Sequence, residues 1–172
     1  SLSNFAGGVL ILLFRPFEVG DTITSNNGTS GTVERIDILY TTLISGDGIK
    51  VFSPNGPLAN SIIQNFSKIV NRRFEYEVGI SYDTNIKDAR EVILNVLRND
   101  ERILKTPAPE VVVKGLGDSS VNLVIHAWTL KENFLASSNE NQEAIKYALE
   151  KHEIALAHPP KEMRLITDKE IK

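Results

Sequence analysis

An apolar run near the start of the sequence constrains the fold more than any other feature. Residues 5–14 contain no charged or strongly polar side chain. If the run is helical, its apolar side chains point in all directions, and such a helix must be enclosed on every side by protein or lipid. Crossing a bilayer takes about 20 residues, so we expect no membrane span within this sequence. The apolar side chains of this helix therefore need contacts with other parts of the protein, with other chains or with lipid.

We predict a helix over residues 1–14. Pro16 should end it, because the residue before a proline avoids the helical conformation. Ser3 and Asn4 are each followed four residues later by a glycine, Gly7 and Gly8, and this spacing lets another backbone approach one face of the helix. A buried core helix or a cleaved signal peptide are the alternatives. No basic residue precedes the run, which argues against a signal peptide. The sequence opens on serine and not methionine, so we expect a fragment of a longer protein.

Composition divides the chain into two parts. Nine charged residues lie before residue 71 and thirty-two after it, whereas eight of the eleven glycines precede residue 57. Two differently built units are therefore expected to meet near residue 70. The absence of cysteine excludes disulfides, thiolate zinc sites and cysteine nucleophiles. The net charge of -3 lacks the basic excess that is typical of nucleic-acid-binding proteins.

Residues 17–69 are predicted to be β-structure. Asn26–Gly28 and Asp47-Gly48 are turn signals, and the second pair tolerates the positive φ of a type I′ hairpin turn. Residues 54–57 break the pattern because they hold two prolines and a glycine. The expected strands are 21–25, 29–40, 41–45, 49–52 and 61–66. Short strands in this number predict a small Sm-like β-barrel, which leaves no exposed edge.

Residues 70–160 are predicted to form a ferredoxin-like α/β domain. Alternating apolar residues predict a strand over 74–80, and helical spacing begins at Ile86 with Asn85 as the N-cap. A second helix is expected over Leu135–His152, with Ser137 and Glu140 as a capping box. The other expected strands are Val111–Lys114, Val121–Leu130 and Met163–Thr167. The order β-α-β-β-α-β is the ferredoxin-like arrangement, and the fold class is α+β. The predicted divisions are 1–16, 17–69, 70–160 and a C-terminal strand and tail, 161–172.

The residues offer little catalytic chemistry. The three histidines, His126, His152 and His158, are far apart, and no second ligand stands at chelating spacing. The glycines of residues 115–117 precede a strand and not a helix, so they build no phosphate cradle. We therefore expect no catalytic, cofactor-binding or metal-binding residue, and we expect the protein not to be an enzyme. A soluble Sm-like and ferredoxin-like module that binds RNA or regulates a partner is the alternative function, although it would need more basic residues.

A series of motifs in order carries a resemblance to a known family. The motifs are Ser1–Leu10, Phe14–Phe17, Gly20-Asp21, Gly31–Ile36, Thr41–Leu43, Asp47-Gly48, Ser53–Gly56, Asn65–Ser67, Arg72-Arg73, Val78–Asp83 and Leu116–Val121. In this order they resemble the small-conductance mechanosensitive channel (MscS-like) family, from the lower end of the last pore helix to the cytoplasmic region. The resemblance covers essentially the whole chain.

The resemblance implies a homoheptameric channel in a bacterial inner membrane, with this region on the cytoplasmic side. Such a channel opens under membrane tension and releases ions and small solutes in hypo-osmotic shock. The first helix is then the lower part of the pore-lining helix, and the two following domains build a vestibule with side portals. Membrane lipid would be contacted through upstream helices, and neither a cofactor nor nucleic acid is expected as a partner.

The resemblance also implies roles for six residues. Asn4 matches a polar position of the pore helix that docks on the β domain in the closed or inactivated state, and Gly56 matches its docking point. Gly8 matches a glycine at which the helix can kink, although it could instead serve close packing. Three residues near the junction of the two domains are candidates for lining the portals. They are Arg72, Arg73 and Glu75.

Overall fold

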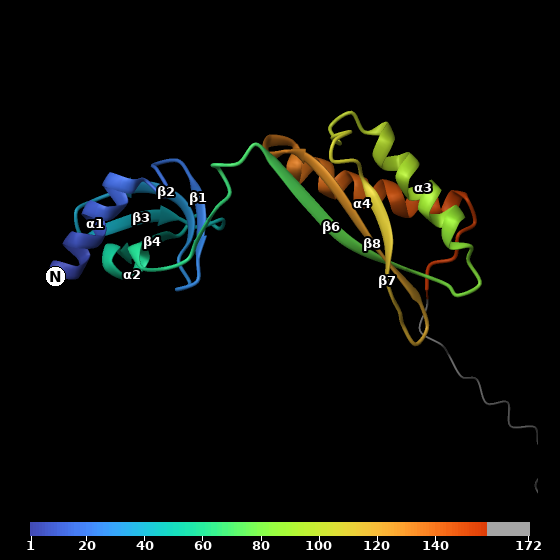
Figure 1. Cartoon of the computed structure of the whole chain (residues 1–172), viewed down its shortest axis with the longest axis horizontal. Helices are drawn as coiled ribbons and strands as arrows, with labels where there is room; N and C mark the ends of the chain where they lie inside the picture. The colour runs from blue at the N-terminus through green and yellow to red at the C-terminus, as the bar shows by residue number, and fades with distance from the viewer. Residues whose placement is uncertain (158–172) are drawn as a thin grey trace, which may run out of the picture. The chain divides into compact units, whose positions relative to one another are not determined.

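The computed structural model describes residues 1–157. The chain forms two compact units, one over Ser1–Val70 and one that begins at Asn71 (Figure 1). Among the described residues, no helix combines the length and the hydropathy that a membrane crossing requires.

The first unit is an antiparallel sheet with two helices. Its elements are α1 (Leu2–Phe14), β1 (Thr22–Ser25), β2 (Ser30–Ile36), β3 (Tyr40–Ile44), β4 (Lys50–Pro54), α2 (Asn55–Ala59) and β5 (Ile63–Asn65). The five strands lie in the order β4-β3-β2-β1-β5. In the part of the chain that the structure describes, the outer strands β4 and β5 do not pair with each other, so closure into a barrel is not seen.

Three local features of this unit differ from the sequence prediction. The expected strand 29–40 is divided, because the chain turns where the amide of Asp37 donates to the carbonyl of Tyr40 at 2.8 Å. The short helix α2 begins within the break at residues 54–57 and extends to Ala59. The Asp47-Gly48 hairpin is present, but Gly48 has a positive φ of 85° whereas Asp47 does not. A type I′ turn needs positive φ at both central residues, so that part of the prediction is wrong.

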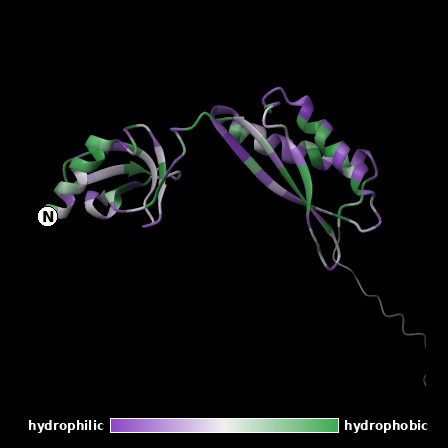
Figure 2. Ribbon diagram, viewed as in Figure 1, coloured by the Kyte–Doolittle hydropathy of each residue, from purple (hydrophilic) through white to green (hydrophobic). Residues whose placement is uncertain are grey.

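The core of the first unit lies between the sheet and α1. It consists of Ile11, Phe17, Ile23, Val33, Leu43 and Leu58. On α1 itself only Gly7, Gly8 and Ile11 are buried, although Figure 2 shows the helix to be apolar along most of its length. The unit therefore covers one side of α1, and the remaining apolar side chains, such as Leu13 and Phe14, are exposed.

The second unit has the predicted ferredoxin-like order as far as it is described. Its elements are β6 (Asn71–Ile80), α3 (Ile86–Asn99), β7 (Glu110–Leu116), β8 (Val121–Leu130), the 3-10 turn η1 (Lys131–Asn133) and α4 (Phe134–Lys151). The antiparallel sheet has the order β6-β8-β7. After α4, Leu156 forms an antiparallel bridge with Ile80 at the outer edge of β6. The predicted strand Met163–Thr167 lies outside the described residues.

The core of the second unit lies between the sheet and both helices. Phe74, Leu123 and Ile125 of the sheet pack with Ile93 of α3 and Ile145 of α4. Helical spacing of apolar residues therefore decides which side of each helix is buried, and both helices cover the same face of the sheet.

The two predicted helix caps of this unit have different outcomes. The Asn85 side chain accepts a hydrogen bond from the amide of Lys87 at 2.9 Å, so the predicted N-cap of α3 is confirmed. The predicted capping box at Ser137 and Glu140 is wrong, because α4 begins three residues earlier, at Phe134. Both side chains instead contact the loop that follows α3.

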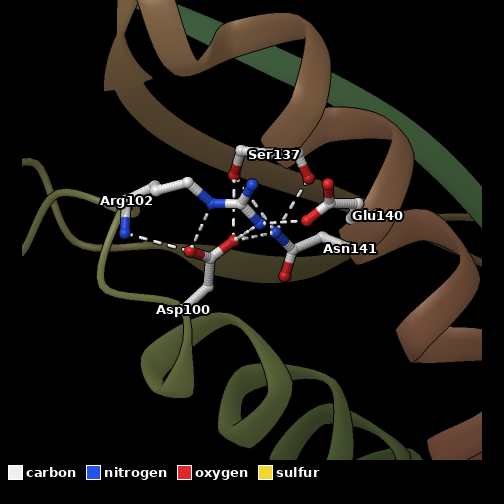
Figure 3. Close-up of polar contacts among 5 residues, drawn as sticks. All are labelled: Asp100, Arg102, Ser137, Glu140 and Asn141. Atoms are coloured by element: carbon white, nitrogen blue, oxygen red, sulfur yellow. Dashed lines mark hydrogen bonds and ion pairs between the residues drawn. The ribbon is translucent and has the colours of Figure 1, made fainter.

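A carboxylate at the end of α3 joins the two helices (Figure 3). Asp100 accepts hydrogen bonds from Nε and Nη2 of Arg102, both at 2.8 Å, and from Ser137 and Asn141 of α4. Arg102 also donates to Glu140 at 2.7 Å. Burial alone would raise the pKa of Asp100, but the hydrogen bonds from Arg102, Asn141 and Ser137 outweigh it and hold that pKa well below its usual range.

We expect Asp100→Asn to lower the free energy of unfolding of the second unit by roughly 2 kcal/mol near pH 7, because it removes charge-assisted hydrogen bonds. A carboxyl whose pKa is lowered by folding stabilises the protein above its unfolded-state pKa, and this stabilisation is lost as the pH falls. The wild-type free energy should therefore decline below about pH 4, and the variant should lack that component. Urea unfolding followed by fluorescence of Trp128, the single tryptophan, measures both effects.

Glu91→Gln is the matched control. It removes an ion pair with Arg98 whose side chains are both more than half exposed, so it should change the free energy of unfolding by less than about 1 kcal/mol. Equal stability of Asp100→Asn and the wild type at neutral pH would contradict the role given to Asp100.

Candidate functional site

The first turn of α2 is completed by a side chain of α1. The amide of Gly56 donates to Oδ1 of Asn4 at 3.1 Å. The residue before α2, Pro54, makes no side-chain capping bond, and the amides of a first helical turn have no partner within the helix. Asn4 therefore acts as a cap for a helix that lies about fifty residues away in the sequence. The structure brings together two of the predicted site residues.

Three glycines bring α1 close to α2 and to the turn between β2 and β3. A Cβ atom on Gly7 would lie 2.4 Å from the carbonyl oxygen of Asn55, and one on Gly8 would lie 2.3 Å from that of Ile38. On Gly56 it would lie 2.5 Å from Oγ of Ser3. Real Cβ contacts are never this short, so a larger residue at Gly7 or Gly8 would push α1 away from these carbonyls, whereas one at Gly56 would require the side chains of Ser3 and Asn4 to move. α1 runs without interruption through Gly8, whose role in this structure is close packing.

Asn55 belongs to the site, although the sequence analysis missed it. Its side chain is fully buried, and its Oδ1 accepts from the Thr41 hydroxyl while its Nδ2 donates to the carbonyl of Asp37, both at 2.8 Å. Its backbone amide donates to the carbonyl of Leu39 at 3.0 Å. Asn55 thus fixes the turn that presents the Ile38 carbonyl to Gly8. An asparagine between a proline and a glycine indicates a turn, and this signal conceals the buried role.

The lower end of α1 is fixed to the end of β5. Arg15 ends the helix with a left-handed backbone, φ 48°, and its carbonyl accepts a hydrogen bond from Nζ of Lys68 at 2.7 Å. Nδ2 of Asn65 donates to Asp21 at 2.8 Å. The segment between α1 and β1 is therefore held from both sides, so a displacement of α1 would act on the sheet.

The three candidate portal residues do not share one face of β6. Arg72 points to the helix-covered side, where its guanidinium lies 3.6 Å from the ring centroid of Phe134. Arg73 and Glu75 point to the opposite side and form an ion pair at 3.2 Å. Glu75 also contacts His126 at 2.8 Å. Alternation along a strand separates neighbouring side chains in this way, so the Arg72-Arg73 pair is not one basic patch.

This site is a packing contact between two helices. In the described part of the chain no group of three or more histidine, aspartate or glutamate residues could hold a metal ion. The contacts between α1 and α2 include the hydrogen bond of Asn4 with Gly56 and the close approach of Gly7 to the Asn55 carbonyl, and Ile11 and Leu58 are buried in one core.

We expect Gly8→Ala to release α1 from α2. In an exposed helix, replacing glycine by alanine is favourable by about 1 kcal/mol, whereas here the new methyl group would overlap the Ile38 carbonyl, and overpacking costs roughly 1–3 kcal/mol. Amides of α1 should therefore exchange hydrogen with solvent faster, by roughly tenfold, in hydrogen-exchange mass spectrometry.

Gly46→Ala is the control for this experiment, because nothing lies within 4 Å of a Cβ at that position. Its exchange pattern in α1 should match the wild type. Slower exchange of α1 in Gly8→Ala than in the wild type would show that helix propensity, and not the contact with Ile38, governs this position.

Comparison with protein families gives one consistent match. Residues 1–68 match the family described as the mechanosensitive ion channel beta-domain. Residues 74–156 match the family described as mechanosensitive ion channel MscS, C-terminal.

Individual relatives agree with this match. A small-conductance mechanosensitive channel of Edwardsiella ictaluri is 34% identical over 96% of the chain and 57% of the relative. The channel MscMJ of Methanocaldococcus jannaschii is 32% identical over 92% of the chain and 46% of the relative. The chain thus spans about half of the length of these curated relatives.

Solved structures share the fold. The crystal structure of Helicobacter pylori MscS, described as a closed state, has a TM-score of 0.89 and 30% sequence identity, and the match covers 97% of this chain and 66% of that one. Arabidopsis thaliana MSL1 has a TM-score of 0.80 at 22% identity, with 92% of this chain and 59% of that one covered. At that identity the second similarity concerns the fold alone.

Proposed function

The chain belongs to the MscS family of mechanosensitive ion channels, and from this premise we propose that it is the cytoplasmic vestibule portion of such a channel. The channel opens under membrane tension and releases ions and small solutes in hypo-osmotic shock. The family consists of channels and not of enzymes. We propose that this chain likewise has no catalytic role.

The hydrogen bond between Asn4 and Gly56 is the observation that carries the proposal. It joins the lower part of the pore helix to the β unit, beside the contacts of Gly7 and Gly8. The similar structure of Helicobacter pylori MscS is described as closed, so we assign the docked arrangement of α1 to a non-conducting state. Gly8 then has two roles, close packing when docked and the site of a kink when the helix moves.

The exposed surface of α1 supports an assembly. Leu2, Leu13 and Phe14 are each more than two-thirds exposed in a single chain. A homo-oligomer, which we take to be a heptamer, would cover them with neighbouring copies and with lipid. We place the assembly in a bacterial inner membrane with this region on the cytoplasmic side, and membrane lipid is a partner through helices upstream of this sequence.

The portal role is proposed for the polar side of β6. Arg73 and Glu75 are about half exposed and would meet passing ions, whereas Arg72 packs on Phe134 and would position the strand. RNA is not a proposed partner, since the family match covers both units.

Asn4→Ala in the full-length channel tests the docking role. Loss of one hydrogen bond, about 0.5–1.5 kcal/mol, should shift the balance between docked and undocked helix by roughly 2- to 10-fold. Recovery from inactivation in excised patches should become correspondingly faster, because less energy holds the helix in the docked state. The unitary conductance should stay unchanged.

Asn95→Ala makes the same chemical change on an exposed position of α3 and should leave the kinetics as in the wild type. Patch-clamp traces of Asn4→Ala with unchanged recovery would remove the assignment of Asn4 and Gly56 to inactivation.

Native mass spectrometry at micromolar concentration tests the assembly, and we expect a ring, with seven copies as the main species. A Phe14→Ser variant should dissociate more readily, because it reduces the apolar surface that neighbouring copies would cover. A monomeric mass for both the full-length protein and this region would contradict the oligomer.

A further inference from the structure

The sheet of the second unit has one face without helices. Both α3 and α4 pack on the face that carries Phe74, Leu123 and Ile125, as Figure 1 shows by the two helices lying together beside the sheet. Residues of opposite parity on the strands therefore form the other face. On β6 these include Arg73, Glu75 and Glu77, on β7 Glu110 and Lys114, and on β8 Val124, His126 and Trp128.

His126 stands between two carboxylates on this face. In the strand register it is opposite Glu75 on β6 and opposite Glu110 on β7. Its Nε2 lies 2.8 Å from Oε2 of Glu75, and its Nδ1 lies 2.9 Å from Oε1 of Glu110. The histidine side chain is 17% exposed, while those of Glu75 and Glu110 are 46% and 61% exposed. The imidazole thus spans the middle strand and joins both outer strands.

The number of N–H groups on the His126 ring decides how many of its two carboxylate contacts can be hydrogen bonds. A neutral imidazole carries one N–H, so one of its nitrogens would present a lone pair to a carboxylate oxygen. Only the imidazolium donates to both carboxylates at once. Both contacts are therefore hydrogen bonds only in the protonated form. Histidine as a residue type changes charge between about pH 5 and 8.

The other charged groups on this face are already paired. Arg73 binds Glu75 at 3.2 Å, and Lys114 binds Glu77. Glu77 is opposite Val124, and Lys114 lies in the register shift of β7 between Val113 and Gly115, so this second ion pair crosses β8. Arg73, Glu75 and Glu110 together carry one net negative charge, which a protonated His126 cancels.

We propose that His126 is a proton-dependent bridge that sets the charge of this face and thereby the preference of the vestibule for cations over anions. The proposal rests on the proposed function, in which Glu75 meets passing ions. With a neutral imidazole the face is negative and favours cations, since rings of like charge select permeating ions of opposite sign. The imidazolium neutralises the face and ties β6, β8 and β7 together, so the preference is lost when His126 is protonated.

The bridge itself is tested on this chain by NMR of the histidine rings. At about pH 5.5, His126 should show two slowly exchanging ring N–H signals, because a carboxylate holds each proton. His152 of α4, whose Nδ1 contacts only the Ala148 carbonyl, is the internal comparison and should not show both. Glu75→Gln and Glu110→Gln should each weaken the signal of the nitrogen that they face. Absence of the two signals from His126 in the wild type would overturn the bridge.

The effect on selectivity is tested in the full-length channel by reversal potentials under a potassium chloride gradient. Between about pH 7.5 and 5.5, the wild type should shift toward equal permeability for potassium and chloride. His126→Gln should lose this shift and keep the cation preference of neutral pH, while His126→Arg should show the acid value at both pH values. His152→Gln should respond as the wild type does.

The outcomes separate the two levels of the proposal. A wild-type reversal potential that is the same at both pH values, or a full shift retained in His126→Gln, would overturn the selectivity role. A full-length protein without any tension-activated current would overturn the proposed function instead, and the ring N–H signals would then still decide whether His126 forms the bridge.

Discussion

Backbone contact between α1 and α2 is the constraint on which the arrangement of the first unit depends. Gly7, Gly8 and Gly56 lie so close to opposing atoms that any Cβ would collide with them, and Asn4 adds the hydrogen bond that fixes the register of the two helices. Neither helix could hold this position alone, because α2 has five residues and short helices are marginal without tertiary contacts. The position of each helix therefore depends on its contact with the other.

The second unit uses charge differently on its two sides. On the helix side, Asp100 is enclosed by donors and stays ionised, which holds α3 to α4 at any pH near neutrality. On the open side, His126 meets two acceptors and gains its full set of hydrogen bonds only with a proton. One small domain thus holds a carboxylate among hydrogen-bond donors on one side of its sheet and an imidazole between two acceptors on the other.

Much of the fold was predictable from local patterns. Alternation at residues 74–80, helical spacing after Asn85 and the apolar run at residues 5–14 each determine an element with little help from the rest of the chain. The helix α2 was not predictable, because Pro54–Pro57 reads as a turn until a partner caps its first amides. The same holds for Ser137 and Glu140, whose capping-box spacing is real but whose bonds go to Asp100 and Arg102.

The sequence by itself determined the family and the two units, because both depend on motifs and composition that are local in the chain. The pairing of Asn4 with Gly56 was expected only through the resemblance to that family, since the two residues lie far apart in the sequence. Only the tertiary structure decided which side of β6 each charged residue occupies, that Asn55 is buried beneath Gly8, and that His126 stands between Glu75 and Glu110. These relations join residues from separate strands, and strand register together with burial is a property of the whole sheet.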